Sequence, residues 1–215
     1  MEVLTWIIIA VIFIVATICV YMWRYKTNKG SEKTGSTKNW HRYVGVALLC
    51  VVIIGVAFIG FLYLNNNIGI SKSEIESDIR TSQKISAEWA TEGMVSDTVA
   101  AFISYPQDKS DHTFSVYVTH PRLSFGYFFR DGGTIAIIDE SIAEFTFEGF
   151  DERAFISMNT QNVERLEMVY RDEIQTININ SEKPFAIVLP VNVESVTFYD
   201  TQGNIVEFEK DLYIS

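Results

Sequence analysis

The sequence predicts a two-helix transmembrane hairpin followed by an extracytoplasmic, mainly-β domain, an antiparallel β-sandwich, with a short amphipathic helix joining the two parts. Three observations predict this class. Two long apolar runs without charge lie in the first 71 residues, a basic segment separates them, and short alternating segments fill the rest of the chain. We expect 1–23 and 43–64 to be the spans, 24–42 the connecting loop, 65–94 a polar linker with the amphipathic helix, and 95–215 the β domain.

The two apolar runs are long enough to cross a bilayer. Val3 to Trp23 holds 21 residues without a charge, and a helix of that length reaches about 32 Å, the thickness of a hydrocarbon core. The run from Tyr43 to Leu64 is similar and has tyrosines near both ends, where aromatic belts lie. Buried core helices are usually much shorter. Since neither run contains an ionisable acid, base or histidine, the hairpin is predicted to be an anchor in the lipid bilayer rather than a transporter.

The loop between the runs predicts the orientation. It carries six basic residues against the single acid Glu32, and the positive-inside rule places such a loop in the cytoplasm. Both the N-terminus and the C-terminal domain then face outward. A cysteine-free outer domain without a glycosylation sequon favours a bacterial cell membrane. The topology-determining residues are Arg24, Lys26, Lys29, Lys33, Lys38 and Arg42.

The charge of the outer domain excludes some partners. The chain has a net charge of −10, and the segment from Lys72 onward contains 25 acids against 11 basic residues, a net charge of −14. Such a surface repels nucleic acid, so we expect no nucleic-acid partner. The cysteines, Cys19 and Cys50, both lie in the apolar runs. The outer domain therefore has no disulfide and no thiolate metal site, and it must fold by core packing.

An amphipathic helix is expected at the start of the outer domain. Ser73 and Glu76 have the spacing of a capping box. The apolar residues that follow fall on one helical face, and the helix is expected to end near Gly93. It could continue the second span or pack on the sheet. The apolar stripe comprises Ile75, Ile79, Ile85 and Trp89.

From Val95 onward the apolar period changes to two, which is typical of half-buried strands. The alternation is clearest in 114–119 and 144–148, and turn signals such as Asp131-Gly132-Gly133 separate the segments. Eight to ten short strands at this spacing predict two antiparallel sheets packed face to face. A curled sheet or partial barrel is the alternative.

The most distinctive segment runs from Ser124 to Gly133 and has four aromatic residues in five positions. One interpretation is an aromatic binding face for a glycan or a partner protein. The other is a central strand that is buried on both faces. The possible partner-binding residues are Phe125, Tyr127, Phe128, Phe129 and Arg130.

No pattern in the sequence predicts catalytic, cofactor-binding or metal-binding residues. His112 and His120 lie at a polar turn and a strand end, both common places for an uninvolved surface histidine, and no G-x-S-x-G or H-E-x-x-H motif occurs. Calcium remains open, because acids in turns could supply oxygen ligands. The candidate calcium pairs are Asp108 and Asp111, Asp139 and Glu140, and Asp151 and Glu152.

These observations predict a non-enzymatic binding module of the cell envelope that needs no small-molecule cofactor. Its partner is expected to be another envelope protein or a subunit of a membrane complex. Two alternatives are a membrane sensor that signals through a separate partner and a carboxylate-dependent envelope hydrolase. A cleft with one strongly perturbed carboxylate would mark the hydrolase.

Overall fold

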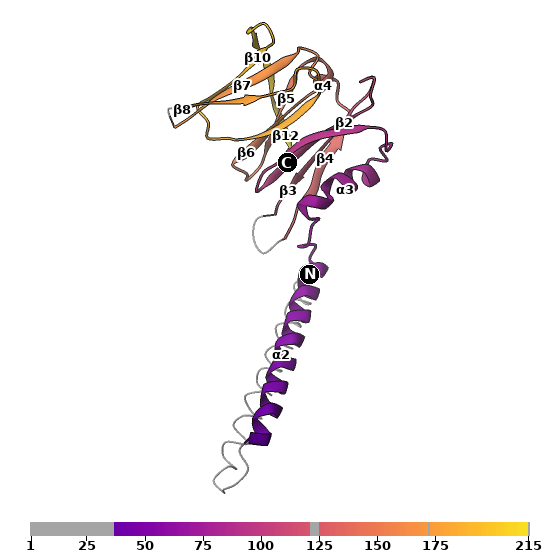
Figure 1. The fold of residues 1–215 in the computed structure, drawn as a ribbon, viewed down its shortest axis with the longest axis vertical. Coiled ribbons are helices and arrows are strands. Elements are labelled where there is room, and N and C mark those ends of the chain that lie inside the picture. The colour runs from indigo at the N-terminus through magenta and orange to yellow at the C-terminus, as the bar shows by residue number, and fades with distance from the viewer. Residues whose placement is uncertain (1–36, 121–124, 172, 215) are drawn as a thin grey trace. The chain divides into compact units, whose positions relative to one another are not determined.

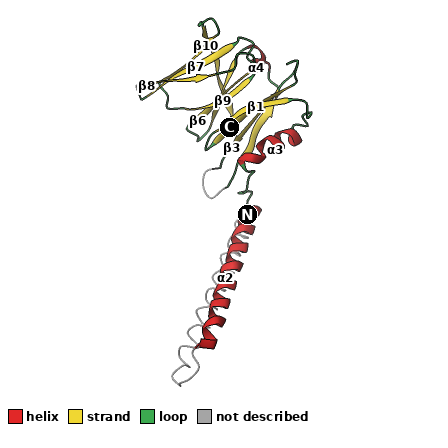
Figure 2. Ribbon diagram, in the orientation of Figure 1, coloured by secondary structure: helices red, strands yellow, loops and turns green. Residues whose placement is uncertain are grey.

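The computed structural model describes residues 37–120, 125–171 and 173–214 (Figure 1). The chain divides into two compact units, Met1–Ile68 and Gly69–Ser215. The described part of the first unit is mainly one helix, and the second unit is mainly β-structure (Figure 2). The predicted mainly-β domain is therefore confirmed.

Helix α2 (Thr37–Leu64) contains the whole of the second apolar run. It begins before the predicted boundary, so that Lys38 and Arg42, which we expected in the loop, are helical. Among the residues that the structure describes, no helix is long and apolar enough to be identified as a membrane span. The first predicted span, 1–23, and the other four basic loop residues lie outside the described part of the chain.

The described residues of the second unit form three four-stranded sheets with the orders β1-β2-β3-β4, β12-β5-β6-β9 and β11-β10-β7-β8. The pairs are antiparallel except for β12 with β5, which is parallel. The first two sheets are formed by β1 (Ala90–Val95), β2 (Val99–Tyr105), β3 (Thr113–Val118), β4 (Phe128–Gly133), β5 (Ile142–Phe147), β6 (Glu152–Ser157), β9 (Phe185–Pro190) and β12 (Phe208–Ile214). The third is formed by β7 (Val163–Tyr170), β8 (Glu173–Asn178), β10 (Ser195–Asp200) and β11 (Ile205–Val206).

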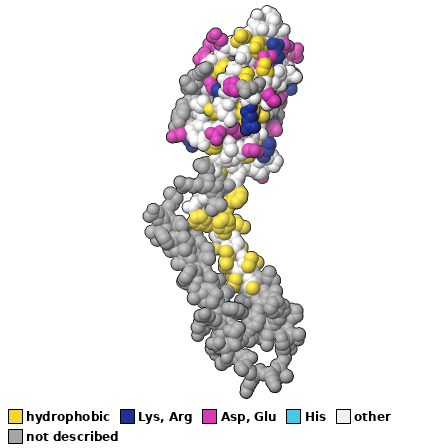
Figure 3. All heavy atoms as spheres, turned by 90° about the vertical axis from the view of Figure 1, so that its left-hand side faces the viewer, with side chains coloured by type: hydrophobic (Ala, Val, Ile, Leu, Met, Phe, Trp, Pro, Cys, Tyr) yellow, Lys and Arg dark blue, Asp and Glu magenta, His cyan; other side chains and the backbone are white. Residues whose placement is uncertain are grey.

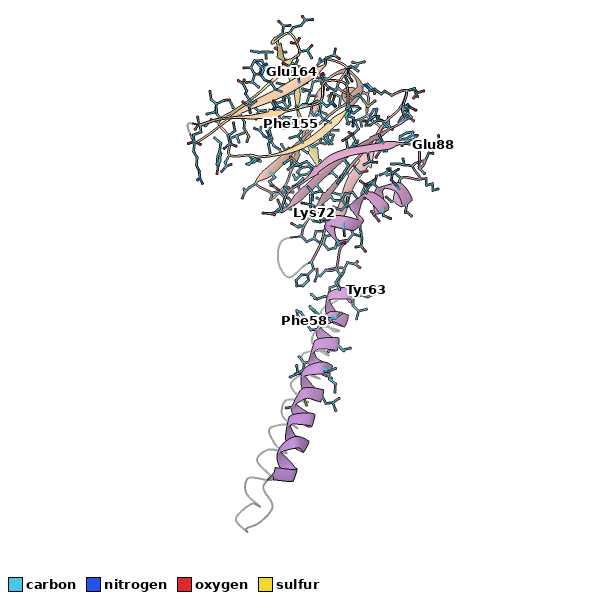
Figure 4. The ribbon with its side chains drawn as sticks, viewed as in Figure 1. Phe58, Tyr63, Lys72, Glu88, Phe155 and Glu164 are labelled. Atoms are coloured by element: carbon cyan, nitrogen blue, oxygen red, sulfur yellow. The ribbon has the colours of Figure 1, made fainter. Side chains whose placement is uncertain are left out.

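The sheet β12-β5-β6-β9 is the middle layer of a stack of three. Alternate residues of β6 belong to different cores: Ile156 faces the first sheet and Phe155 faces the third. In Figure 4 the ring of Phe155 lies within the stack of strands. The predicted two-sheet sandwich is thus extended by a third layer. A third layer forms because the middle sheet is apolar on both faces. In β9, Phe185 to Leu189 is a continuous apolar run, which is typical of a strand buried on both faces.

Helix α3 (Ile75–Ser82) covers the outer face of the first sheet, which was one of the two arrangements expected for the amphipathic helix. Ile75 and Ile79 are fully buried against that sheet. The hydroxyl of Tyr117 on β3 donates to Asp78 Oδ2 at 2.7 Å. The helix ends well before Gly93, and β1 occupies a segment that we expected in the linker.

The capping box lies two residues earlier than the sequence pattern predicted. It joins Ser71 to Glu74 at the short 3-10 helix η1 (Lys72–Glu74). The Ser71 backbone N–H donates to Glu74 Oε2 at 3.1 Å, and the hydroxyl of Ser71 donates to the same oxygen at 2.7 Å. These hydrogen bonds hold the pKa of the Glu74 carboxyl below its usual value.

Candidate functional site

Strand β4 lies at the edge of the first sheet and carries the C-terminal part of the aromatic segment. The sequence alternative of a strand buried on both faces is wrong, since most of the β4 side chains are exposed or half-buried. Arg130 has no partner in the register with β3, because Tyr117 pairs with Phe129 and Val116 pairs with Asp131. This β-bulge and the flanking charges interrupt the free edge of the strand, as edge strands commonly require.

The five candidate residues do not form one aromatic face. Phe125 is 57% exposed, Phe129 is 48% exposed, and Arg130 is also exposed. The ring of Phe128 is half-buried and stacks on His120 with the centroids 3.9 Å apart. Phe128 pairs with Val118 and Phe129 with Tyr117, so their side chains project from opposite faces of the sheet.

Tyr127 has a structural position. It is buried in the core beneath α3, and its hydroxyl donates to the backbone oxygen of Ser96 at 2.5 Å. Its backbone pairs with Ile70, which ties the aromatic segment to the start of the unit. Burial, and then the nearby carboxylates of Asp97 and Glu152, raise the pKa of the Tyr127 hydroxyl.

Three exposed side chains therefore remain as a candidate binding surface. We call Phe125, Phe129 and Arg130 the β4 edge surface. In the described part of the second unit, Phe125 and Phe129 are the large aromatic side chains that are exposed. The ring of Phe129 is supported from below by Tyr117, in an edge contact with centroids 5.5 Å apart. A rigidly supported, exposed aromatic residue loses little conformational entropy when a partner covers it.

The structure overturns the expectation that His112 is a surface histidine. Its side chain is 1% exposed, and Nδ1 lies 2.9 Å from Asp139 Oδ1. Nε2 is buried and has no hydrogen-bond partner. His112 also lines a pocket of about 440 Å³. Sequence reasoning missed this pairing, because Asp139 is distant in the sequence and no motif links the two residues.

Carboxylates among the candidate calcium ligands interact with other side chains of the protein. Asp108 accepts hydrogen bonds from Ser110, which lower the pKa of its carboxyl, and Asp139 pairs with His112. Glu152 accepts the hydroxyls of Ser96 and Thr98. Within the described ranges, no three histidine, cysteine or acidic side chains come together to hold a metal ion.

A cleft with one strongly perturbed carboxylate would mark a hydrolase. The resolved carboxylate shifts, at Glu74, Asp108 and Asp200, are all downward and arise from hydrogen bonds to the charged form. Glu74 and Asp108 are exposed, and Asp200 is half-buried. These shifts are those of solvated turn and cap residues.

No protein family, no characterised protein and no solved structure matches this chain at a significant level.

The division between Tyr127 and Phe125 predicts different effects on stability. Truncating the buried ring in Tyr127→Ala is expected to lower the free energy of unfolding by about 3 to 5 kcal/mol. Phe125→Ala removes an exposed ring and is expected to change it by less than about 0.5 kcal/mol. Urea denaturation of the full chain, followed by circular dichroism, measures both. Equal losses for the two variants would contradict the assignment of Phe125 to a free surface.

Proposed function

We propose that this chain is a membrane-anchored binding module of the bacterial cell envelope, which holds another envelope protein through the β4 edge surface. The observation that carries the proposal is the exposure of Phe125 and Phe129 on a domain that otherwise buries most of its large aromatic side chains. Exposed aromatic residues beside an arginine are typical of the residues that dominate binding energy at protein interfaces.

The mode of recognition follows from the edge of the sheet. A partner that added a strand to β4 would need a regular row of free backbone groups, but the bulge at Arg130 and the charge of Asp131 interrupt that row. Recognition through side chains fits better. The complementary partner surface is an apolar socket for the rings with an acidic group for Arg130.

Membrane attachment is supported by the surface of α2. From Leu49 to Leu64 its apolar side chains project away from the helix axis, as Phe58 and Tyr63 do in Figure 4, and they line the described part of the helix in Figure 3. Exposed apolar surface of this extent is typical of a site that interacts with a membrane or with another protein, and in this proposal the lipid bilayer covers it. The exposed residues are Leu49, Val51, Val52, Ile53, Ile54, Val56, Phe58, Ile59, Tyr63 and Leu64.

In this proposal the basic segment that includes Arg24 and Lys33 stays in the cytoplasm, and the acidic second unit lies outside. The lipid bilayer is then the environment of both apolar runs. The acidic charge of the outer unit would favour encounter with a basic partner and repel nucleic acid.

Cross-linking in living cells tests the binding surface. A photoreactive amino acid that replaces Phe129 is expected to capture one envelope protein, identified by mass spectrometry. The matched control places the same group at Ile174, which is 70% exposed on β8 in another sheet. Capture from position 129 that disappears in Arg130→Ala supports the proposal. Equal capture from both positions, or no capture from position 129, would contradict the proposed binding surface.

The proposed topology has a separate test. In a chain with Cys19→Ala and Cys50→Ala, a cysteine introduced at Ser110 is expected to react with a membrane-impermeant maleimide in intact cells. A cysteine introduced at Ser31 should react only after the membrane is permeabilised. The reverse pattern, or release of the chain by alkaline carbonate, would show that the orientation or the anchoring is wrong.

A further inference from the structure

The edge of strand β8 is long and regular, whereas the other sheet edges in the described part of the chain are interrupted, short or covered. β4 and β12 carry register shifts against their neighbours, and β11 has two residues. β1 and β9 pack against each other, where the Val188 N–H donates to Met94 Sδ at 3.4 Å. β8 lies at the margin of the second unit in Figure 1, pairs with β7 without a shift, and exposes five of its six residues. Another strand can add to an edge of this kind.

The backbone groups that β8 leaves free belong to alternate residues. The N–H of Ile179, which follows the strand, donates to the backbone oxygen of Glu164 at 2.8 Å. Because this direction alternates along a strand, the odd-numbered residues of β8 bond β7 and the even-numbered residues face the open edge. The register agrees, since Val169, opposite Ile174, instead accepts the N–H of Glu194 on its other side. The free N–H and C=O groups are therefore those of Ile174, Thr176 and Asn178.

The side chains of β8 do not protect this edge. The strand reads EIQTIN and contains neither the lysine nor the proline that commonly blocks strand addition. Its single charge is Glu173, at the first position. Ile174 is 70% exposed, the largest exposed fraction among the large apolar side chains of β8. Covering β8 with another strand would remove this apolar surface from water.

A second copy of β8 fits the open edge in antiparallel orientation. With Thr176 opposite Thr176 of the second copy, Ile174 lies opposite Asn178, and all three free residues meet their counterparts. Each hydrogen-bonded pair exchanges two bonds, so the two copies form roughly six backbone hydrogen bonds. The central threonine pair is a favourable cross-strand combination.

The charges also favour this orientation. Glu173 then lies opposite Ile179 of the second copy, and the two Glu173 carboxylates are six residues apart along the strands, about 20 Å. This separation exceeds the Debye length of about 8 Å at physiological salt. Parallel pairing would place the two glutamates side by side, where like charges are destabilising.

We propose that two copies of this chain associate through antiparallel pairing of β8 about a two-fold axis at Thr176, which joins the third sheet of each copy into one sheet of eight strands. Such an interface is small, below the roughly 1,000 Å² of a stable complex, so the pair forms where copies are concentrated. Opening it disturbs neither core, so β8 still exchanges its amides faster than the middle sheet. The pairing does not involve the β4 edge surface, and either proposal can fail while the other stands.

Disulfide cross-linking tests the pairing and its register. The full-length chain with Cys19→Ala and Cys50→Ala is oxidised by copper phenanthroline in freshly lysed cells, so that the result does not depend on membrane orientation. Thr176→Cys is expected to give a disulfide-linked dimer, because the paired Cα atoms lie about 5.5 Å apart. Ile174→Cys alone should not, since its two copies lie about 13 Å apart. Co-expression of Ile174→Cys with Asn178→Cys, on chains with tags of different size, should restore the cross-link.

Charge variants provide a matched control. Adding Thr176→Lys to both chains of the Ile174→Cys and Asn178→Cys pair is expected to reduce the cross-link several-fold, because the two ammonium groups oppose each other. Thr176→Val keeps a neutral β-branched residue and should preserve the cross-link. Thr176→Lys on one chain with Thr176→Glu on the other should restore it. Gln202→Cys, in the exposed turn after β10, measures random collision.

Three results would overturn the proposal. If Thr176→Cys gives no more dimer than Gln202→Cys, β8 does not pair with itself. If Ile174→Cys alone links as readily as Thr176→Cys, the two-fold register is wrong. A photoreactive group at Ile174 should capture the chain itself, and capture of a different protein there would assign the edge to another partner.

Discussion

Burial of the middle sheet on both faces is the constraint on which the rest of the second unit depends. Strands β5, β6 and β9 contribute alternate side chains to two separate cores, one against the first sheet and one against the third. Burying both faces removes far more apolar surface from water than one face would. The outer sheets and α3 can then each carry one solvated face, which leaves the edge strand β4 free to expose Phe129 and Arg130.

The same burial favours a partner for each polar group in these layers. Glu144 on β5 is 3% exposed and pairs with Arg153 Nη1 on β6 at 2.5 Å, so removing either side chain would leave the other charge buried and unpaired. Asn159 adopts a positive φ of 57° at the end of β6. Its side chain bonds the backbone of Val163, Asn180 and Lys183, which joins the middle sheet to the third. Three buried side-chain atoms of the described residues lack such a partner: His112 Nε2, Ser115 Oγ and Arg153 Nε.

Much of the β-structure could be predicted from residue periodicity, and the layering could not. Alternation in 114–118 correctly marks β3, and the Ile75 and Ile79 spacing correctly marks α3. A continuous apolar run such as that of β9 shows burial on both faces but does not reveal which sheets cover it. The return of β12 to pair in parallel with β5 depends on contacts distant in sequence. The sequence marks the aromatic segment from Ser124 to Gly133 as distinctive. It does not predict that Tyr127 is buried and Phe129 exposed, because that depends on the register of β4 against β3.

Hydrogen–deuterium exchange of the full chain, read by mass spectrometry, tests the three-layer account most directly. The amides of β5 and β6 lie inside the middle sheet, whereas β8 is an edge strand with mostly exposed side chains. The account predicts that peptides from β5 and β6 exchange far more slowly than those from β8, because opening them disrupts both cores. Exchange of β5 and β6 at the rate of β8 would contradict a middle sheet that is buried on both faces.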